Sequence, residues 1–254
     1  MTVVHSGNVG DILWGLPSVL DLLQRRRASR CRFYLRCNVH AGYGPTLRHP
    51  AGQVRMDERM ARALIPLLEA QPWIESAKVW DGEPAAVNLD LFRGSGFDYS
   101  KGDIATYYQH VLYCRPNLAE PWLTVPDGPQ VNGRPLLVCL TWRYRNHNLN
   151  YRFLTRYENV LYVGTPEEYE TFREQVGNRI PHYRTDDLLK LAQEVKACRG
   201  LVCNQTAVAA IADGLKVPRV LEVSPGCPNV HWHGPGGYHA WRQDLLERAV
   251  ADLG

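Results

Sequence analysis

Asp11, in the stretch GNVGDILWGLP at residues 7–17, is one candidate for a catalytic side chain. Gly7 and Gly10 permit a tight turn between a first strand and a first helix. The stretch lacks the P-loop pattern and the third glycine of a dinucleotide fingerprint, and a carboxylate at a helix start competes with phosphate. Asp11 is therefore either a helix cap or a carboxylate that acts in catalysis or contacts an acceptor.

A second group of candidates follows an apolar strand, in the segment LTWRYRNHNLNYRFL at residues 140–154. Thr141, Arg143 and Arg145 supply hydroxyl and guanidinium donors that suit a phosphate or pyrophosphate. The alternative is a solvated polar loop. Because α/β sheets bind ligands in the loops that follow their strands, both interpretations stand.

A third group lies in LVCNQTAVAAIADGLKVPRVLEV at residues 201–223. Asn204, Gln205 and Thr206 form a turn between a strand and a helix of small residues, where free N–H groups suit a pyrophosphate anion. The alternative is an ordinary capped helix packed on a sheet. Glu222, in the next strand, either accepts hydrogen bonds from ribose hydroxyls or is an exposed carboxylate at a strand end.

Three histidines, His231, His233 and His239, lie near Cys227 in a loop rich in glycine and proline. The loop has no carboxylate at a spacing typical of metal ligands, so we expect a connecting loop and no metal site. The sequence also lacks the G-x-S-x-G and H-E-x-x-H signatures, which leaves hydrolase functions without support.

The composition is typical of a globular protein. Of 254 residues, 45% are hydrophobic and 22% are charged, and no apolar run approaches the roughly 20 residues of a membrane span. The first residues, MTVVHSGN, lack the regions of a signal peptide, and the seven scattered cysteines form no C-x-x-C pair. We therefore expect a soluble cytoplasmic protein with reduced thiols and no stable membrane insertion.

The net charge of +3 is too small to indicate a nucleic-acid partner by itself. The arginines are unevenly spread, however, and an early cluster contains Arg25, Arg26, Arg27, Arg30, Arg32 and Arg36. Such a cluster is either a solvated face or a contact for an anionic substrate or partner.

Apolar patterns of strands and helices alternate in both halves of the chain. The first half has expected strands at 3–5, 31–38, 74–82 and 86–93, and expected helices at 11–26, 57–70 and 103–114. The second half has expected strands at 136–142, 159–164, 200–205 and 218–223, and expected helices at 166–176, 185–198, 206–215 and 240–253. Pro17 is expected to interrupt the first helix or to delay its start.

This order predicts an α/β fold of two Rossmann-like lobes with parallel sheets and a ligand cleft between the lobes. The segment at 115–135 contains five prolines and is the expected linker. We expect an N-terminal lobe at 1–128, a C-terminal lobe at 129–236, and a C-terminal helix at 237–254 that could pack back on the first lobe.

Three stretches, in this order, resemble the heptosyltransferase-like family of GT-B glycosyltransferases. GDILWGLP at residues 10–17 matches the family's G-D-[IV]-[LI]-x-x-x-P loop. EPWLTVPD at residues 120–127 is similar to the P-W-L segment ahead of the linker, and CNQTAVAAIADGLKVPRV at residues 203–220 is similar to a second-lobe stretch that follows a strand. The resemblance spans nearly the whole chain and implies a nucleotide-sugar donor on the second lobe and an acceptor on the first.

The resemblance also implies roles for single residues. Asp11 would be the general base that deprotonates an acceptor hydroxyl, and Arg143, with Arg145, would stabilise the departing diphosphate. The donor-binding residues would be Thr141, Arg145, Tyr183, Asn204, Gln205, Thr206 and Glu222, and the acceptor-side loop would contain Asn8 and Gly10. No metal and no cofactor are implied, because the nucleoside-diphosphate sugar is a substrate.

The acceptor implied is the hydroxyl of a saccharide, a glycolipid or a hydroxylated base in nucleic acid. The family's usual Asp-Thr-Gly is Asn-Gln-Thr here, at residues 204–206. Two alternatives to a transferase remain. One is a nucleotide-sugar-binding protein without turnover, and the other is a nucleotide-sugar isomerase on a similar scaffold.

Overall fold

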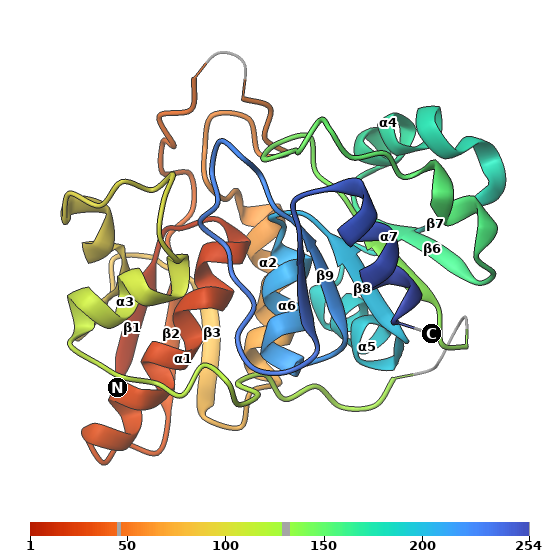
Figure 1. Ribbon diagram of the computed structural model, residues 1–254. Coiled ribbons are helices and arrows are strands. Elements are labelled where there is room, and N and C mark those ends of the chain that lie inside the picture. Colours follow the sequence, from red (N-terminus) through yellow and green to blue (C-terminus); the bar gives the residue numbers. More distant parts are fainter. Residues whose placement is uncertain (45–46, 129–132, 254) are drawn as a thin grey trace.

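Two parallel β-sheets, each flanked by helices, form the protein (Figure 1). The computed structural model describes residues 1–44, 47–128 and 133–253. The first sheet has the strand order β3-β2-β1-β4 and the second has β10-β9-β8-β5-β6-β7. All neighbouring strands run parallel, which confirms the predicted α/β fold of two Rossmann-like lobes.

The first lobe carries its elements in the order expected of repeated strand–helix units. Its strands are β1 (Thr2–His5), β2 (Cys31–Leu35), β3 (Ile74–Val79) and β4 (Val87–Asn88). Its helices are α1 (Val9–Arg25), α2 (Glu58–Glu69), α3 (Ile104–Leu112) and the 3₁₀ helix η1 (Leu89–Gly94).

The second lobe repeats this pattern around a larger sheet. Its strands are β5 (Leu136–Cys139), β6 (Val160–Val163), β7 (His182–Tyr183), β8 (Gly200–Cys203), β9 (Arg219–Glu222) and β10 (Gly237–Ala240). Its helices are α4 (Pro166–Val176), α5 (Leu188–Ala197), α6 (Ala207–Leu215), α7 (Gln243–Ala251) and the 3₁₀ helices η2 (Arg152–Arg156) and η3 (Gly177–Arg179). Strands β5, β6, β8 and β9 are buried throughout, as expected where both faces of a parallel sheet are covered.

Helix α1 begins at Val9 and continues through Pro17 to Arg25, so the expected interruption is wrong. Proline removes one hydrogen bond of the helix. The face that carries Ile12, Leu16 and Val19 is fully buried, and this packing outweighs the lost bond because tertiary contacts supply most of a helix's stability.

Two expected boundaries are also wrong. The strand expected at 86–93 ends after Val87–Asn88, because the Asn88 side chain accepts the Asp90 N–H (2.9 Å) and starts η1. The segment expected as the last helix opens with part of β10, and α7 begins only at Gln243. Helix α7 packs on the second sheet and not on the first lobe, since Leu246 and Val250 join the apolar cluster of that sheet.

The described part of the linker is bound along the interface of the lobes. Trp122 and Leu123 each donate a backbone hydrogen bond to the carbonyl of Gly214 at the end of α6 (3.0 and 3.1 Å), and both side chains are buried. Residues 129–132, and with them the expected lobe boundary at 128/129, lie outside the described residues.

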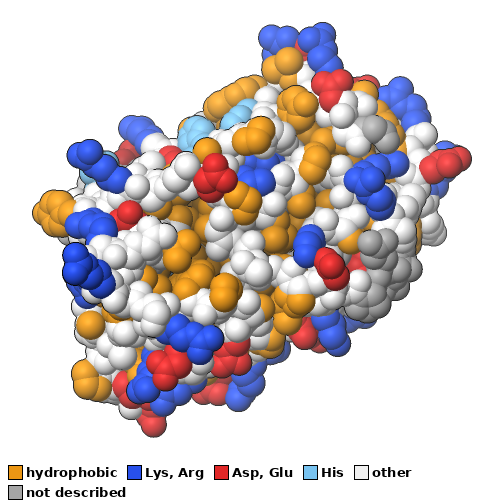
Figure 2. All heavy atoms as spheres, turned by 90° about the horizontal axis from the view of Figure 1, so that it is seen from below, with side chains coloured by type: hydrophobic (Ala, Val, Ile, Leu, Met, Phe, Trp, Pro, Cys, Tyr) orange, Lys and Arg blue, Asp and Glu red, His pale blue; other side chains and the backbone are white. Residues whose placement is uncertain are grey.

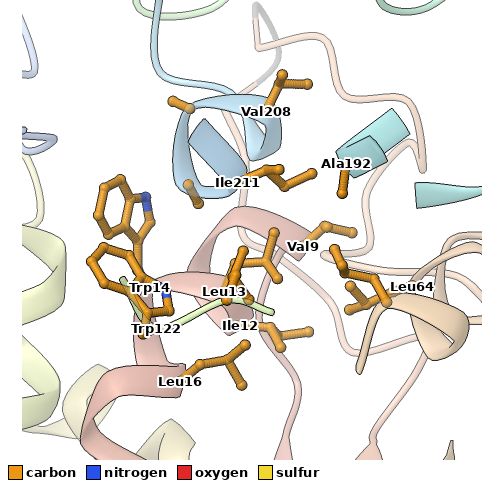
Figure 3. Close-up of a cluster of buried hydrophobic side chains, with 14 of the residues drawn as sticks. Val9, Ile12, Leu13, Trp14, Leu16, Leu64, Trp122, Ala192, Val208 and Ile211 are labelled. Carbon is orange, nitrogen blue, oxygen red and sulfur yellow. The ribbon is translucent and has the colours of Figure 1, made fainter. Parts of the chain in front are cut away.

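One continuous apolar core joins the two lobes. Helix α1 packs against α6, and α2 packs against α5. In Figure 3, Val9 and Leu13 of α1 lie on the side of α6 that carries Ile211, with Leu64 of α2 and Ala192 of α5 beside Val9. Val208 of α6 belongs to the same buried cluster. The lobes are therefore held together by buried apolar surface and not by the linker alone.

Each sheet has one point at which the order of its strands reverses. In the first sheet this point lies between β1 and β4, and in the second between β5 and β8. Ligands of open parallel sheets bind beyond the carboxyl ends of the strands at such points. The segments after β1, β4, β5 and β8 are therefore the place to look for a site.

Arg36 directly follows β2, and its guanidinium carbon lies 5.0 Å from the centre of the Trp80 ring. The other members of the early arginine cluster lie away from these points. Residues 25–32 connect the end of α1 to the start of β2, at the amino ends of the strands. Arg32 pairs with Glu75 (3.0 Å) and Arg30 donates to the Pro72 carbonyl (3.2 Å). Figure 2 shows Lys and Arg side chains interspersed with Asp and Glu around apolar groups on one face of the molecule. These contacts favour the solvated-face interpretation of the cluster.

Within the described residues, no helix has both the length and the apolar character needed to cross a bilayer.

The shared core predicts that the lobes unfold together. Leu13→Ala should lower the free energy of unfolding by about 2–5 kcal/mol, because it leaves a cavity where α1 meets α6. Urea denaturation followed by circular dichroism and by tryptophan fluorescence should give one transition with coincident midpoints. Leu91→Ala, at a side chain that is 52% exposed, is the control. Two separated transitions in the wild type would contradict a shared core.

Candidate active site between the lobes

Asp11 lies in the first turn of α1 and makes both of its side-chain contacts through one oxygen. Oδ2 accepts the backbone N–H of Asn8 (3.3 Å) and pairs with the Arg93 guanidinium. The side chain is 15% exposed, and Oδ1 has no hydrogen-bond partner among the described residues. Asp11 therefore caps its helix, as one interpretation expected, and still has an oxygen available to a ligand.

Arg93 was not predicted from the sequence. It comes from η1, after β4, and so reaches Asp11 across the reversal point of the first sheet. Burial opposes its charge, but the nearby Asp11 carboxylate raises the pKa of Arg93 above its ordinary value. Its Nε is buried without a hydrogen-bond partner. The only sequence signal was its position at the end of an expected strand.

A buried network fixes the turn that leads to Asp11. His5 Nε2 lies 2.7 Å from the Tyr108 hydroxyl, which donates to the Asp11 carbonyl (2.8 Å). On the other side of the ring, His5 Nδ1 lies 2.8 Å from the Gly7 N–H and 2.9 Å from Asp90 Oδ1. Burial opposes ionisation of Asp90, but its bonds from His5 and from the Ser6 N–H hold its pKa well below the usual range. The position of Asp11 is thus set by three elements: β1, η1 and α3.

In the second lobe, Asn204 organises the loop after β5. Its Oδ1 accepts the Thr141 N–H (2.9 Å), and its Nδ2 donates to the carbonyls of Thr141 (3.1 Å) and Arg143 (2.7 Å). The side chain is fully buried. Asn204 was expected to hold phosphate, but its amide is occupied by this loop, so the structure corrects that role to one of positioning.

Glu222 is likewise a buried structural residue. It is 0% exposed, and its carboxylate accepts Arg145 Nε (3.0 and 3.2 Å), the Asn146 N–H and the Tyr151 hydroxyl. Both interpretations from the sequence, a ribose contact and an exposed carboxylate, are therefore wrong. Arg145 was expected to bind diphosphate, but this carboxylate raises its pKa against the opposing effect of burial and holds it in the loop.

The start of α6 is capped and partly covered. Thr206 Oγ1 accepts the Ala209 N–H (3.2 Å), and Gln205 Nε2 donates to Asn229 Oδ1. Gly10 lies within α1 and not in a loop, and a Cβ on it would be 3.6 Å from Ala207 Cα. Gly10 therefore allows the first turns of α1 and α6 to approach each other closely.

Arg143 has no carboxylate partner among the described residues, and its Nε is buried without a hydrogen bond. Burial and then the Arg143 charge lower the pKa of His49, in the first lobe, to about 4. Beside it, the Tyr43 hydroxyl donates to Asn8 Oδ1 (2.7 Å), which occupies the Asn8 oxygen. Arg143 thus faces the lobe that carries Asp11. Nearby in the sequence, the Thr141 hydroxyl is also buried and has no hydrogen-bond partner among the described residues.

Tyr183 lies apart from this group. It ends β7, the edge strand two positions from β5. Burial and the carboxylates of Glu194 and Asp187 raise its pKa, which places its phenol near α5.

Two surface hollows lie away from the segments that follow β1, β5 and β8. One, of about 360 Å³, is lined by residues from η2 to β6 and by Ile180, and the other, of about 530 Å³, lies between η1 and α3.

The loop between β9 and β10 ties the lobes together through His233. Its Nε2 lies 2.8 Å from Asp103, at the start of α3, and its Nδ1 lies 2.9 Å from Asp213 of α6. Burial opposes its charge, but the hydrogen bonds to the two carboxylates raise the pKa of His233 to about 9. Within the described residues, no group of three or more His, Cys, Asp and Glu side chains could hold a metal ion.

His233 should make stability depend on pH. The pKa of His233 rises from 6.5 in the unfolded chain to about 9 in the folded protein. The charged imidazole therefore stabilises the folded protein fully below about pH 6.5, and this stabilisation is lost as the pH rises through about 9. The loss should amount to about 2–3 kcal/mol of unfolding free energy. Thermal unfolding from pH 6 to 10 should show His233→Gln far less stable than wild type at pH 6 and nearly equal at pH 10. His147→Gln, at an exposed position, is the control. A difference in stability between His233→Gln and wild type that does not vary with pH would contradict the role of the charged imidazole.

The Glu222 carboxylate should contribute to the free energy of unfolding. Glu222→Gln leaves the Arg145 charge buried without its carboxylate and should cost about 3 kcal/mol of unfolding free energy. Glu247→Gln breaks the exposed pair with Arg156 (2.9 Å) and should cost less than about 1 kcal/mol. Urea denaturation measures both, and equal stability of Glu222→Gln and wild type would refute the structural role.

No protein-family profile and no curated protein matches the sequence, whereas solved structures do. E. coli heptosyltransferase WaaC with ADP has a TM-score of 0.63 at 10% identity, and the match covers 100% of this chain and 99% of that one. The glycosyl transferase family 9 from Veillonella parvula DSM 2008 has a TM-score of 0.63 at 13% identity, with 99% and 96% covered. E. coli ADP-heptose lps heptosyltransferase II has a TM-score of 0.60 at 15% identity, with 99% and 97% covered. The chain therefore has the heptosyltransferase-like GT-B fold.

Proposed function

We propose that this protein is a glycosyltransferase that moves a sugar from a nucleoside-diphosphate sugar to an acceptor hydroxyl. One observation carries the proposal. Among the described residues, Oδ1 of Asp11 has no hydrogen-bond partner and Arg143 has no carboxylate partner, and the two residues belong to the reversal points of the two sheets. A group that can accept a proton and a group that can neutralise a diphosphate are the two that sugar transfer needs.

The proposed reaction uses the two oxygens of Asp11 differently. Arg93 and the Asn8 N–H hold Oδ2, and Oδ1 accepts the proton of the acceptor hydroxyl. The acceptor oxygen forms a bond to the anomeric carbon while the bond from that carbon to the diphosphate oxygen breaks. Arg143 then meets the negative charge that grows on the leaving diphosphate.

The donor is proposed to lie on the second lobe, near the start of α6. The unpartnered Thr141 hydroxyl and the capped helix start, with Gln205 and Thr206, support this placement. Two of the similar structures are titled as complexes with ADP and with ADP-2-deoxy-2-fluoro heptose, so ADP-sugars are the first donors to test. The proposal requires no metal and no cofactor. The acceptor is a saccharide, a glycolipid or a hydroxylated base in nucleic acid.

Asp11→Asn tests the proposal. It should lower the rate of nucleoside-diphosphate release in an acceptor screen by about 100-fold or more, because the amide cannot take a proton. Donor binding, measured as a shift in melting temperature with ADP, UDP, GDP and their sugars, should stay within about twofold of wild type. Asp21→Asn, on the same helix and paired with Arg25 (3.5 Å), is the matched control.

Three other outcomes decide among the alternatives. Binding of donors without turnover in any acceptor screen would favour a binding protein. A changed nucleotide sugar in a reaction without acceptor would favour an isomerase. If none of the nucleotides shifts the melting temperature at millimolar concentration, the site does not bind nucleotides and the proposal fails.

A further inference from the structure

Tyr144 has a backbone conformation that is uncommon for its residue type. Non-glycine residues with positive φ among those described are Arg27, Asn38, Tyr113, Tyr144, Asn159 and Lys216. Tyr113 and Lys216 directly follow α3 and α6, where the left-handed conformation closes a helix, and Arg27 lies one residue beyond the C-cap of α1. Asparagine tolerates this conformation. Tyr144, with φ of +55°, is neither a helix end nor an asparagine.

The neighbours of Tyr144 hold it in this conformation. Before it, the Arg143 carbonyl accepts Asn204 Nδ2 (2.7 Å). After it, Arg145 Nε is bound to Glu222 (3.0 Å), and Asn146 Nδ2 donates to the Trp241 carbonyl (3.1 Å). A loop pinned on both sides imposes the unfavourable backbone on the residue between. Strained conformations of this kind are found more often at active sites and ligand clamps than elsewhere.

The Tyr144 ring lies beside the guanidinium of Arg143. The Arg143 guanidinium carbon lies 5.8 Å from the centre of the ring. Burial raises the pKa of the phenol to about 12, and Arg143, Asp11 and Tyr43 all act on it electrostatically. The ring is therefore neutral, lies beside Arg143 and is only partly buried.

We propose that Tyr144 is the platform on which the ring of the transferred sugar packs. This inference rests on the proposed function. A sugar held between Asp11 and Arg143 presents apolar C–H groups on one face, and a neutral aromatic ring covers such a face while the hydroxyls remain free for hydrogen bonds. Tyr144 would then select a pyranose-sized sugar on the donor and contribute nothing to binding of the free nucleoside diphosphate.

The test compares each nucleotide with its sugar conjugate. Dissociation constants are measured by calorimetry for ADP against ADP-glucose, UDP against UDP-glucose and GDP against GDP-mannose. In Tyr144→Leu, the ratio of the conjugate's constant to that of the nucleotide should rise roughly fivefold, the value of one aromatic contact, while the constant for the nucleotide stays unchanged. Tyr144→Phe retains the ring and should keep the wild-type ratio.

Tyr113→Leu is the matched control, because Tyr113 has the same backbone conformation (φ +51°) but is 85% exposed at the end of α3. An unchanged ratio in Tyr144→Leu would overturn the inference. So would a parallel loss of affinity for nucleotide and conjugate, since Tyr144 would then only support the loop. If the wild type binds no nucleotide, the proposed function itself fails, and this result is distinct from the other two.

Discussion

The packing of α1 against α6 is the contact on which the rest of the site depends. Each helix starts just after a strand that borders the reversal point of its sheet, so joining the starts of the two helices brings the two points together. The joint is apolar, and Val9 and Leu13 of one lobe share a buried cluster with Val208 and Ile211 of the other. Gly10 has no side chain to keep the helices apart. Burial of apolar surface thus places the polar groups, which could not by themselves hold two lobes together in water.

The polar residues around this joint divide into those that support the site and those that are available to a ligand. Asn204, Glu222 and His5 are fully buried, and their hydrogen bonds are made within the protein. They set the loop that contains Arg143 and Tyr144 and the first turn of α1 that contains Asp11. A buried polar group without partners costs free energy, and within the part of the chain that the structure describes Arg143 Nε and the Thr141 hydroxyl are two such groups.

The alternation of strands and helices could be predicted because it depends on the local spacing of apolar residues. The motif around Asp11 and the turn at Thr206 also lay where the pattern placed them. Errors arose where tertiary contacts overrode local rules. Pro17 remains inside α1 because the helix is buried, and the segment after Asn88 turns away from the sheet because a side chain caps η1. Arg93 could not be predicted as a partner of Asp11, since the two residues are distant in the sequence and meet only across the reversal point of the first sheet.

The sequence by itself determined the architecture: two α/β lobes, the order of their elements and the segments in which site residues would lie. These follow from periodicity and turn chemistry, which act over a few residues. Only the folded chain separates the polar side chains that are bound within the protein from those without a partner among the described residues. Arg143 and Arg145 are both arginines and stand two positions apart. Buried Glu222 neutralises Arg145, whereas Arg143 has no carboxylate among its described neighbours. That difference depends on which strand lies next to the loop, and strand order is a property of the folded chain.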